Sequence, residues 1–340
     1  MKSLQLFGLI ALVAATLHGQ TFWSTSSSLD CSSLGENAYG PYTTPTGVQG
    51  YSCFVGGTFA WYASGGAWST AIRVAAPASG AVLVDYLFYD KQGNPVNMDS
   101  AYGSGPANAS GNEVTFALYA NQPREVDLLG ATGNGPGYST LTDGSVYGTF
   151  LCPDATTCMN VQAQLLYSAL PAIPWALSVP IAWDNEESLQ WSAEGIDDGN
   201  VHRVSLAIYN DDVVSTTPTT FTVQVFDSNG NLAGTGVTPA IPPIPTFSDG
   251  SYGEGGTYAV ALSDLISPLP SGIFKVLIDG GSVYSAVVVL QMNGQSATSM
   301  QVAYDTAAGS SVTTSVRRAN ARTAARVASR LKPMLAALAK

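Results

Sequence analysis

The stretch WYASG at residues 61–65 recurs as WSAEG at residues 191–195, which lies 130 positions further along the chain. Arg73-Val74 recurs as Arg203-Val204 at the same offset. The later matches have an offset of 137 and pair 90–94 with 227–231, 145–147 with 282–284, and Gln164 and Tyr167 with Gln301 and Tyr304. A seven-residue insertion near residues 213–218 explains the change of offset. The ordered matches predict that one folding unit occurs twice.

Segments in which apolar and polar residues alternate surround the repeated stretches. Examples are residues 161–167 and 221–225, whereas residues 82–89 are apolar on both faces. A period of two is typical of a strand with one face on a core, and clusters of Gly, Asn, Asp and Pro separate the runs. The pattern predicts an all-β chain with two tandem antiparallel immunoglobulin-like β-sandwich domains. A barrel is the alternative.

The two ends of the chain differ from this body. Lys2 precedes an apolar run from Leu6 to Ala15 that is too short to span a bilayer, which predicts a secretory signal peptide. Two prolines near residues 170–174 interrupt the strand pattern. The expected organisation is a signal peptide at 1–20, a disulfide-pinned extension at 21–57, sandwich domains at 58–170 and 171–305, and a basic tail at 306–340.

The cysteines are Cys31, Cys53, Cys152 and Cys158. An even number of cysteines in an exported chain predicts disulfides. Three pairings are open, and proximity in the sequence favours Cys31–Cys53 and Cys152–Cys158. A metal site is the alternative, although Cys-x5-Cys without a nearby histidine is poor spacing for zinc.

Charge is unevenly distributed. Residues 21–316 contain five basic residues against 24 acidic ones, so this body carries a formal charge of −19. The chain from Arg317 onward contains seven basic residues and no acidic one. An acidic body argues against a nucleic-acid partner, because neutralising phosphates requires Lys and Arg.

Several segments of the second half resemble a known type of domain. They are residues 255–266, 272–278 and 283–290, together with 204–210 and 226–230. These segments resemble a β-sandwich domain of exported acidobacterial-type proteins. The resemblance covers most of residues 175–304 and, less closely, 61–167. It implies a duplicated β-sandwich in an exported protein, and it implies no established activity.

The sequence offers little for catalysis. His202 is the one histidine outside the signal segment, and its alternation with Val204 and Leu206 predicts a core-facing structural role. Neither Gly-x-Ser-x-Gly nor His-Glu-x-x-His occurs, nor does a phosphate-binding Gly loop. We therefore expect no catalytic residue, and the motif set disfavours serine, zinc and nucleotide chemistry.

Two sets of acidic residues have alternative interpretations. Asp184, Glu186, Glu187 and Glu194 lie near Trp183 and Trp191. They would suit glycoside hydrolysis, which requires two carboxylates, but a solvated turn beside core tryptophans is favoured. Asp227 and Asp197 begin oxygen-rich turns that would suit calcium, although Asp-Gly and Asn-Gly are also ordinary turn residues. We expect no cofactor, with calcium as the open alternative.

Two further surfaces are candidates for binding. The first is an aromatic ligand face made of Tyr39, Tyr42, Tyr51, Trp61, Tyr62 and Trp68. Packing between the extension and the first sandwich is its alternative. The second is a surface-binding tail helix with Arg318, Arg322, Arg326 and Arg330 at a spacing of four. This helix would contact an anionic envelope, with docking on the acidic body, disorder or removal as alternatives.

These features favour a non-enzymatic exported structural or interaction protein of the cell surface or extracellular space. Its expected partner is a protein or a glycan. A pair of carbohydrate-binding modules is the first alternative and predicts a row of exposed aromatic rings on one sheet face. A hydrolase of envelope polysaccharide is the second alternative.

Overall fold

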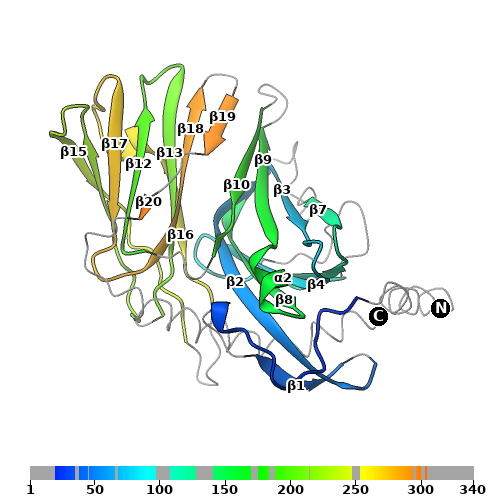
Figure 1. The fold of residues 1–340 in the computed structure, drawn as a ribbon. Helices are drawn as coiled ribbons and strands as arrows, with labels where there is room; N and C mark the ends of the chain where they lie inside the picture. The colour runs from blue at the N-terminus through cyan, green and yellow to red at the C-terminus, as the bar shows by residue number, and fades with distance from the viewer. Residues whose placement is uncertain are drawn as a thin grey trace.

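The computed structural model describes residues 20–304 with internal gaps (Figure 1). The gaps are residues 35–37, 45, 66–67, 97–107, 128–140, 170–174, 184–187, 214, 247–252, 294–295 and 300–302. The expected signal peptide and the expected tail helix with its four arginines lie outside the described residues. The described part is all-β with antiparallel sheets, as the alternation predicts.

The first unit consists of β1–β11 and contains two sheets. The larger sheet has the order β1 (Tyr39–Thr43), β2 (Gln49–Ser64), β8 (Thr142–Cys152), β4 (Val82–Asp90), β6 (Glu113–Leu118) and β5 (Asn108–Ser110). β11 (Ala182–Trp183) also pairs with β2. The smaller sheet has the order β10 (Trp175–Pro180), β9 (Gln162–Ala169), β3 (Trp68–Ala75) and β7 (Pro123–Asp127). β10 and β11 follow the boundary expected at residue 170, so the hydrogen-bonded sheets of the first unit run on to Trp183.

The second unit consists of β12–β20. One sheet has the order β15 (Leu232–Val237), β14 (Thr222–Phe226), β17 (Ile273–Asp279), β12 (Gln190–Ile196) and β20 (Ala303–Tyr304). The other has the order β16 (Thr257–Ala261), β13 (His202–Asn210), β18 (Ser285–Asn293) and β19 (Ser296–Ser299). The helices are short: η1 (Ser32–Leu34), α2 (Ala155–Met159) and α3 (Leu262–Leu265). Within the described ranges, no helix is long and apolar enough to cross a membrane.

The strands of the two units follow the same order. The series β2-β8-β4-β6 in the first unit corresponds to β12-β17-β14-β15 in the second, and β10-β9-β3-β7 corresponds to β19-β18-β13-β16. Counted in chain order within each set of eight strands, the first strand (β2 or β12) borders the sixth (β8 or β17). The seventh strand (β9 or β18) borders the second (β3 or β13). The immunoglobulin order instead places the first strand beside the second and the seventh beside the sixth. Alternation in the sequence shows which face of a strand is apolar, but it does not select the neighbouring strand.

The structure also tests the repeat residue by residue. Asp90 and Asp227 occupy equivalent turns after β4 and β14. Arg73 is paired with Gln164 on β9, whereas its counterpart Arg203 is paired with Met292 on β18. By this pairing, the residue of the second unit that corresponds to Gln164 is Met292, and Gln301 lies outside the described residues. Strands of similar composition can be aligned at more than one register.

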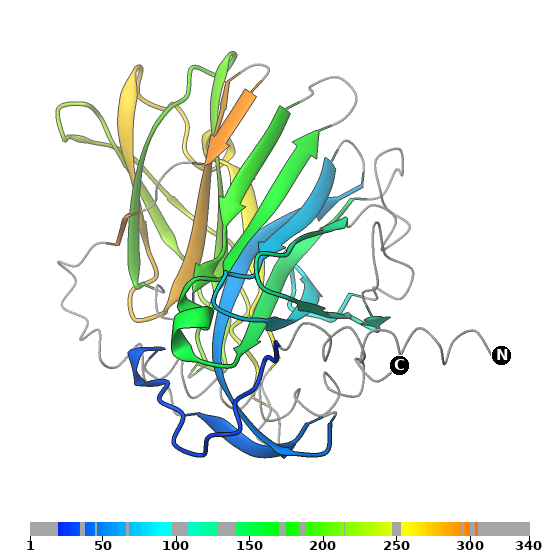
Figure 2. The same cartoon turned by 45° about the vertical axis from the view of Figure 1, so that its right-hand side comes forward.

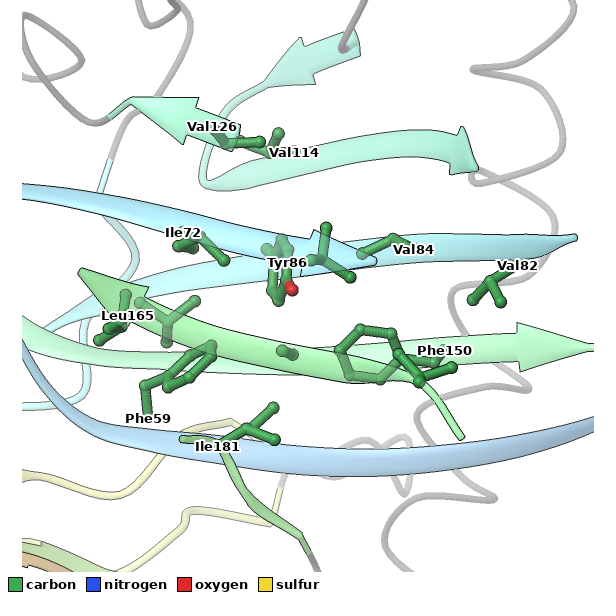
Figure 3. Packing of buried hydrophobic residues seen from close by; sticks show 14 of the residues in the cluster. Phe59, Ile72, Val82, Val84, Tyr86, Val114, Val126, Phe150, Leu165 and Ile181 are labelled. Carbon is green, nitrogen blue, oxygen red and sulfur yellow. The ribbon is translucent and has the colours of Figure 1, made fainter. Parts of the chain in front are cut away.

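The core of the first unit lies between its two sheets (Figure 3). β4 directs Val84 and Tyr86 into it, and Ile72 and Leu165 approach from the smaller sheet. All four side chains are fully buried. The second unit has a separate core that includes Phe221, Val223 and Val225, and this alternation is the one visible in the sequence. Burial of these apolar faces is the main stabilisation of both units.

The two units pack against each other through a smaller apolar cluster. Ala60 of β2 contacts a group from the second unit that includes Tyr209, Ile244 and Ala286. Because Val204, Leu206 and Ile208 on the other face of β13 lie in the second core, this strand is buried on both faces. Figures 1 and 2 show β10 of the first unit beside β19 of the second.

A β-bulge in β2 frees two carbonyl groups, one of which bonds to the second unit. The register with β8 shifts between Phe59 and Tyr62, which takes the intervening carbonyl groups out of the ladder. The Ala60 carbonyl accepts a hydrogen bond from Thr257 Oγ1 of the second unit at 2.8 Å, and the Trp61 carbonyl accepts one from the Tyr167 hydroxyl. Buried backbone carbonyls require such partners, so the bulge and the second unit depend on each other.

Both disulfides favoured by sequence proximity are present, as Cys31–Cys53 and Cys152–Cys158. All four cysteines are buried in the first core. Cys53 and Cys152 face each other on β2 and β8, so the two bridges lie side by side. They join the N-terminal extension and α2 to the larger sheet. Stable disulfides of this kind are typical of oxidising compartments.

Candidate functional site

A cleft of about 620 Å³ lies against β3, β7 and β9 of the first unit and against the segment that follows β10. Its polar and aromatic lining residues are Arg73, Arg124, Glu125, Gln162, Gln164 and Trp183. Ala75 and Pro123 also line it, and their small side chains leave space between the polar ones. The volume is within the usual range of ligand sites, roughly 300–1,000 Å³.

Strand register brings three polar lining residues together. Arg73 on β3 is directly opposite Glu125 on β7 and opposite Gln164 on β9. The Arg73 Nε donates to Glu125 Oε2 at 2.5 Å, and both side chains are about half exposed, at 49% and 42%. The hydroxyl of Ser178 on β10 donates to Gln164 Oε1. The row therefore holds a charged pair and an oriented amide across the smaller sheet.

Arg124 is placed differently from Arg73. It is half-buried, and its guanidinium carbon lies 4.6 Å from the centre of the Phe116 ring. Among the described residues, no carboxylate is within ion-pair distance of this guanidinium. Desolvation lowers the pKa of Arg124 from its ordinary value, although an arginine remains charged at neutral pH. This residue is a cation held by an aromatic ring.

Trp183 reaches the cleft because β11 approaches β2 closely. It is opposite Gly57, where an added Cβ would lie 2.8 Å from the carbonyl oxygen of Ala182. Glycine is therefore required at residue 57 for this pairing. The Trp183 ring packs against Phe150 with the ring centres 5.4 Å apart and the planes at 67°. Trp183 is half-buried, so it presents a fixed apolar surface at the site.

The chemistry of this lining suits binding. Among the described lining residues, the ionisable groups are two arginines and one glutamate, without histidine, cysteine or serine. A general acid and base pair or an activated nucleophile requires groups that this set does not contain. Guanidinium, amide and indole groups instead recognise carboxylates, hydroxyls and apolar ring faces.

The acidic candidates for hydrolysis are not brought together by the described structure. Asp184, Glu186 and Glu187 lie outside the described residues. Glu194 is exposed on β12 and stands opposite Lys275 on β17. Its partner across the sheet is therefore a cation.

His202 does not face the core, contrary to the prediction from alternation. It lies at the first position of β13 with 34% of its side chain exposed, and its Nδ1 is 2.9 Å from Asp198 Oδ2. The alternation holds from Val204 onward, where the strand reaches the core. Hydrogen bonds from the His202 ring and from backbone N–H groups hold the pKa of Asp198 below its ordinary value. The pair lies in the loop that connects β12 of one sheet to β13 of the other.

The turns considered for calcium use their carboxylates within the turn. Asp227 Oδ1 accepts hydrogen bonds from the backbone N–H groups of Asn229 and Asn231, both at 2.9 Å. Asp197 accepts from the N–H groups of Gly199 and Val204. Within the part of the chain that the structure describes, no group of three or more His, Cys, Asp or Glu side chains is placed to hold a metal ion.

The six residues of the predicted aromatic face are divided between several places. Tyr39 and Tyr42 pack with Phe22 and Trp23 of the extension, and burial raises the pKa of Tyr42 to about 12. Tyr51 is half-buried and bridges to Ser24.

Trp61 and Tyr62 are buried in the first core. The Trp61 ring contacts the half-buried Trp68 ring edge to face at 5.3 Å. None of the tryptophan and tyrosine side chains with described burial is classed as exposed, so the described residues contain no row of exposed rings.

The residues of the cleft were not selected as a site from the sequence. Arg73 stood out only as part of the repeat, and Trp183 only as a neighbour of the acidic cluster. The available signal was charge: two of the five basic residues in the acidic body line this one cleft. Their proximity arises from strand register, which the sequence pattern does not specify.

Comparison of the chain with protein-family models, with curated proteins and with solved structures finds no match.

Proposed function

We propose that the protein is a non-enzymatic exported interaction protein that binds a ligand of the cell surface or extracellular space in the cleft of its first unit. The observation that carries this proposal is the composition of the cleft. It combines the Arg73–Glu125 ion pair, the amides of Gln162 and Gln164, and the fixed indole of Trp183, without a described nucleophile or acid–base pair. The residues of this cleft, and not the β-sandwich fold that carries them, would then determine which ligand the protein binds.

Other features support the remaining parts of the proposal. The Lys2 start with its apolar run and the two disulfides support export to an oxidising compartment. The common strand order supports a duplicated β-sandwich in which the first and seventh strands have exchanged neighbours relative to the immunoglobulin order. The sequence resemblance of residues 255–266, 272–278 and 283–290 supports the exported acidobacterial type. The basic tail with Arg318 and Arg330 is proposed to contact an anionic envelope.

Retention on cell-envelope material tests the proposal. Protein without residues 1–20 is mixed with washed envelope polymer, and both bound protein and newly released reducing ends are measured. We expect retention without release. Release above that of heat-denatured protein, abolished by Glu186→Gln or Glu187→Gln, would show a hydrolase instead.

A substitution that fills the cleft links retention to this site. Ala75 lines the cleft, so Ala75→Trp is expected to abolish retention. Ala233 is exposed on the edge strand β15 of the second unit, and Ala233→Trp is the matched control. Equal retention of both variants would place the ligand elsewhere.

A further inference from the structure

We infer that the C-terminal tail of the chain, residues 306–340, docks on the outer face of the larger sheet of the first unit and supplies a cation to Asp85. The outer face is the side of this sheet that points away from the smaller sheet. The inference goes beyond the proposed function, because it concerns a contact within the chain and not the ligand of the cleft.

Alternation along β4 defines the outer face. Val84 and Tyr86 point into the first core (Figure 3), so the residues between and beside them point to the opposite side. Strand register adds residues of β6 and β8 to the same side. The central residues of the outer face are Asp85, Leu87, Thr115, Tyr147 and Thr149. None of them is more than 6% exposed, so this face is buried although it points away from the core.

The apolar clusters of the described residues cover the two ends of the outer face. At one end Leu83 packs with Trp23 of the extension, and at the other end Ala60 packs with the second unit. Leu87 and Tyr147 lie between these ends, and within the described part of the chain they belong to no apolar cluster. Apolar side chains this deeply buried require neighbours, so residues outside the described ranges have to complete their cover.

Asp85 restricts which segment can provide this cover. Its side chain is fully buried, and its Oδ1 accepts a hydrogen bond from Thr115 Oγ1 at 2.9 Å. Burial of a carboxylate is costly unless a cation and hydrogen bonds accompany it. The segment that covers the outer face therefore has to carry Lys or Arg.

The acidic body offers no cation on this face. All five basic residues of the body are described, so the internal gaps of the described ranges contain neither Lys nor Arg. Arg73 and Arg124 belong to the smaller sheet, Arg203 and Lys275 to the second unit, and Lys91 is exposed in the turn after β4. Apart from Lys2 in the expected signal peptide, the remaining basic residues are the seven of the tail.

The tail meets both requirements. Val327, Leu331 and Leu335 recur at a spacing of four, which gives the expected tail helix an apolar stripe to place on the outer face. The four arginines at a spacing of four are offset from this stripe by one residue, which is about 100° around a helix, so they flank it. A flanking arginine can reach Asp85, and the others stay at the surface, where they can contact an anionic envelope.

The end of the described chain lies within reach of the outer face. Tyr304 pairs with Trp191, whose Nε1 donates to the Ser285 carbonyl at 3.1 Å. The next residue, Ala286, belongs to the same apolar cluster as Ala60 of β2. The chain therefore leaves the second unit near its interface with the first, and a dozen extended residues span roughly 40 Å.

Limited digestion with trypsin tests the inference, because a docked helix is a poor substrate for a protease. Protein without residues 1–20 is digested beside a synthetic peptide of residues 306–340, and mass spectrometry follows cleavage after Arg318 and Arg322. We expect cleavage at least roughly tenfold slower in the protein, since proteolysis follows the population of the open form. Equal rates in protein and peptide would overturn the inference.

A substitution on the sheet links protection of the tail to this face. Asp85→Asn removes the charge that the tail neutralises, and we expect it to speed cleavage roughly fivefold or more. Asp197→Asn is the matched control, because Asp197 is also a buried and hydrogen-bonded carboxylate but lies in the second unit. Thermal unfolding of each variant confirms that it is folded. Equal cleavage of the two variants would place the tail elsewhere.

A pair of substitutions in the tail keeps the test decisive if Asp85→Asn fails to fold. Leu331→Asp places a charge on the apolar stripe and is expected to speed cleavage after Arg318 to nearly the rate of the peptide. Ser329→Asp adds the same charge about 200° around the helix and is expected to leave the tail protected. Equal effects of the two substitutions would contradict docking through the apolar stripe.

Two further results would overturn the inference by identifying another occupant or another contact. Protection that is lost on dilution, together with dissociation of a dimer, would mean that a second copy of the chain covers the outer face. Protection that appears only after addition of vesicles of anionic phospholipid would mean that the tail contacts the envelope and not the sheet.

Discussion

Gly93 and Gly230 occupy the same position in equivalent turns of the two units, yet only Gly93 touches the other unit. Their φ angles are 83° and 81°, and each N–H donates to the carbonyl of the preceding aspartate, Asp90 or Asp227, at 2.9 Å. An added Cβ at Gly93 would lie 2.4 Å from the Glu254 carbonyl oxygen of the second unit, whereas one at Gly230 would meet nothing within 4 Å. The first-unit turn is therefore part of the interface between the units.

Gly93→Ala is expected to destabilise the protein more than Gly230→Ala. Both substitutions place an L side chain at positive φ, which costs about 1–2 kcal/mol. Gly93→Ala also forces backbone apart at the interface, and overpacking of this kind costs roughly 1–3 kcal/mol more. Chemical denaturation measures both free energies of unfolding. Equal losses would mean that the turn is not in contact with Glu254.

Thr257→Val is expected to lower the free energy of unfolding by about 1–3 kcal/mol. The substitution keeps the shape but removes the hydroxyl that bonds the Ala60 carbonyl at the bulge. Thr257 is buried, so water does not readily replace it. The control is Thr235→Val at an exposed position of β15, which should change stability little. A Thr257→Val protein as stable as its parent would argue against this link between the units.

The two disulfides are expected to contribute unequally. Cys31–Cys53 closes a 22-residue separation and Cys152–Cys158 a separation of six. In the chain-entropy model, loss of the longer loop costs roughly 3 kcal/mol and loss of the shorter roughly 2 kcal/mol. Double serine variants of each pair, compared by thermal unfolding, measure the two losses. Peptide mapping without reduction checks the pairing, and a Cys53–Cys152 peptide would contradict it.

Stability is expected to fall as the pH drops below about 4, in part through Asp198. Its folded pKa is below the ordinary value near 3.8, so the unfolded chain takes up the proton first. The stabilising contribution is thus present above that pH and is lost as the pH falls through the folded value. Asp198→Asn should flatten the dependence of the unfolding temperature on pH between about 4.5 and 2.5. Glu194→Gln, on the neighbouring strand β12, controls for net charge; an equal flattening would refute the role of Asp198.

Much of the local structure could be predicted from the sequence. The alternation at Phe221, Val223 and Val225 identified a strand and its buried face, because side chains of a strand point to opposite sides in turn. The Asp90 and Asp227 turns were recognisable because glycine tolerates the positive φ that such turns require. Both favoured cysteine pairs also formed, since each pair lies close together in the chain.

Only the tertiary structure determined which residues and strands that are distant in the sequence lie next to each other. Alternation does not determine which strand edge β2 joins, whether a bulge frees the Ala60 carbonyl, or that Glu125, Arg73 and Gln164 share one row. It also predicted a core position for His202, which lies beyond the end of the packed region. The physical reason is that side-chain period is a local property of each strand. Register and neighbour are instead set by the summed packing of all strands at once, and the cleft is a product of that packing.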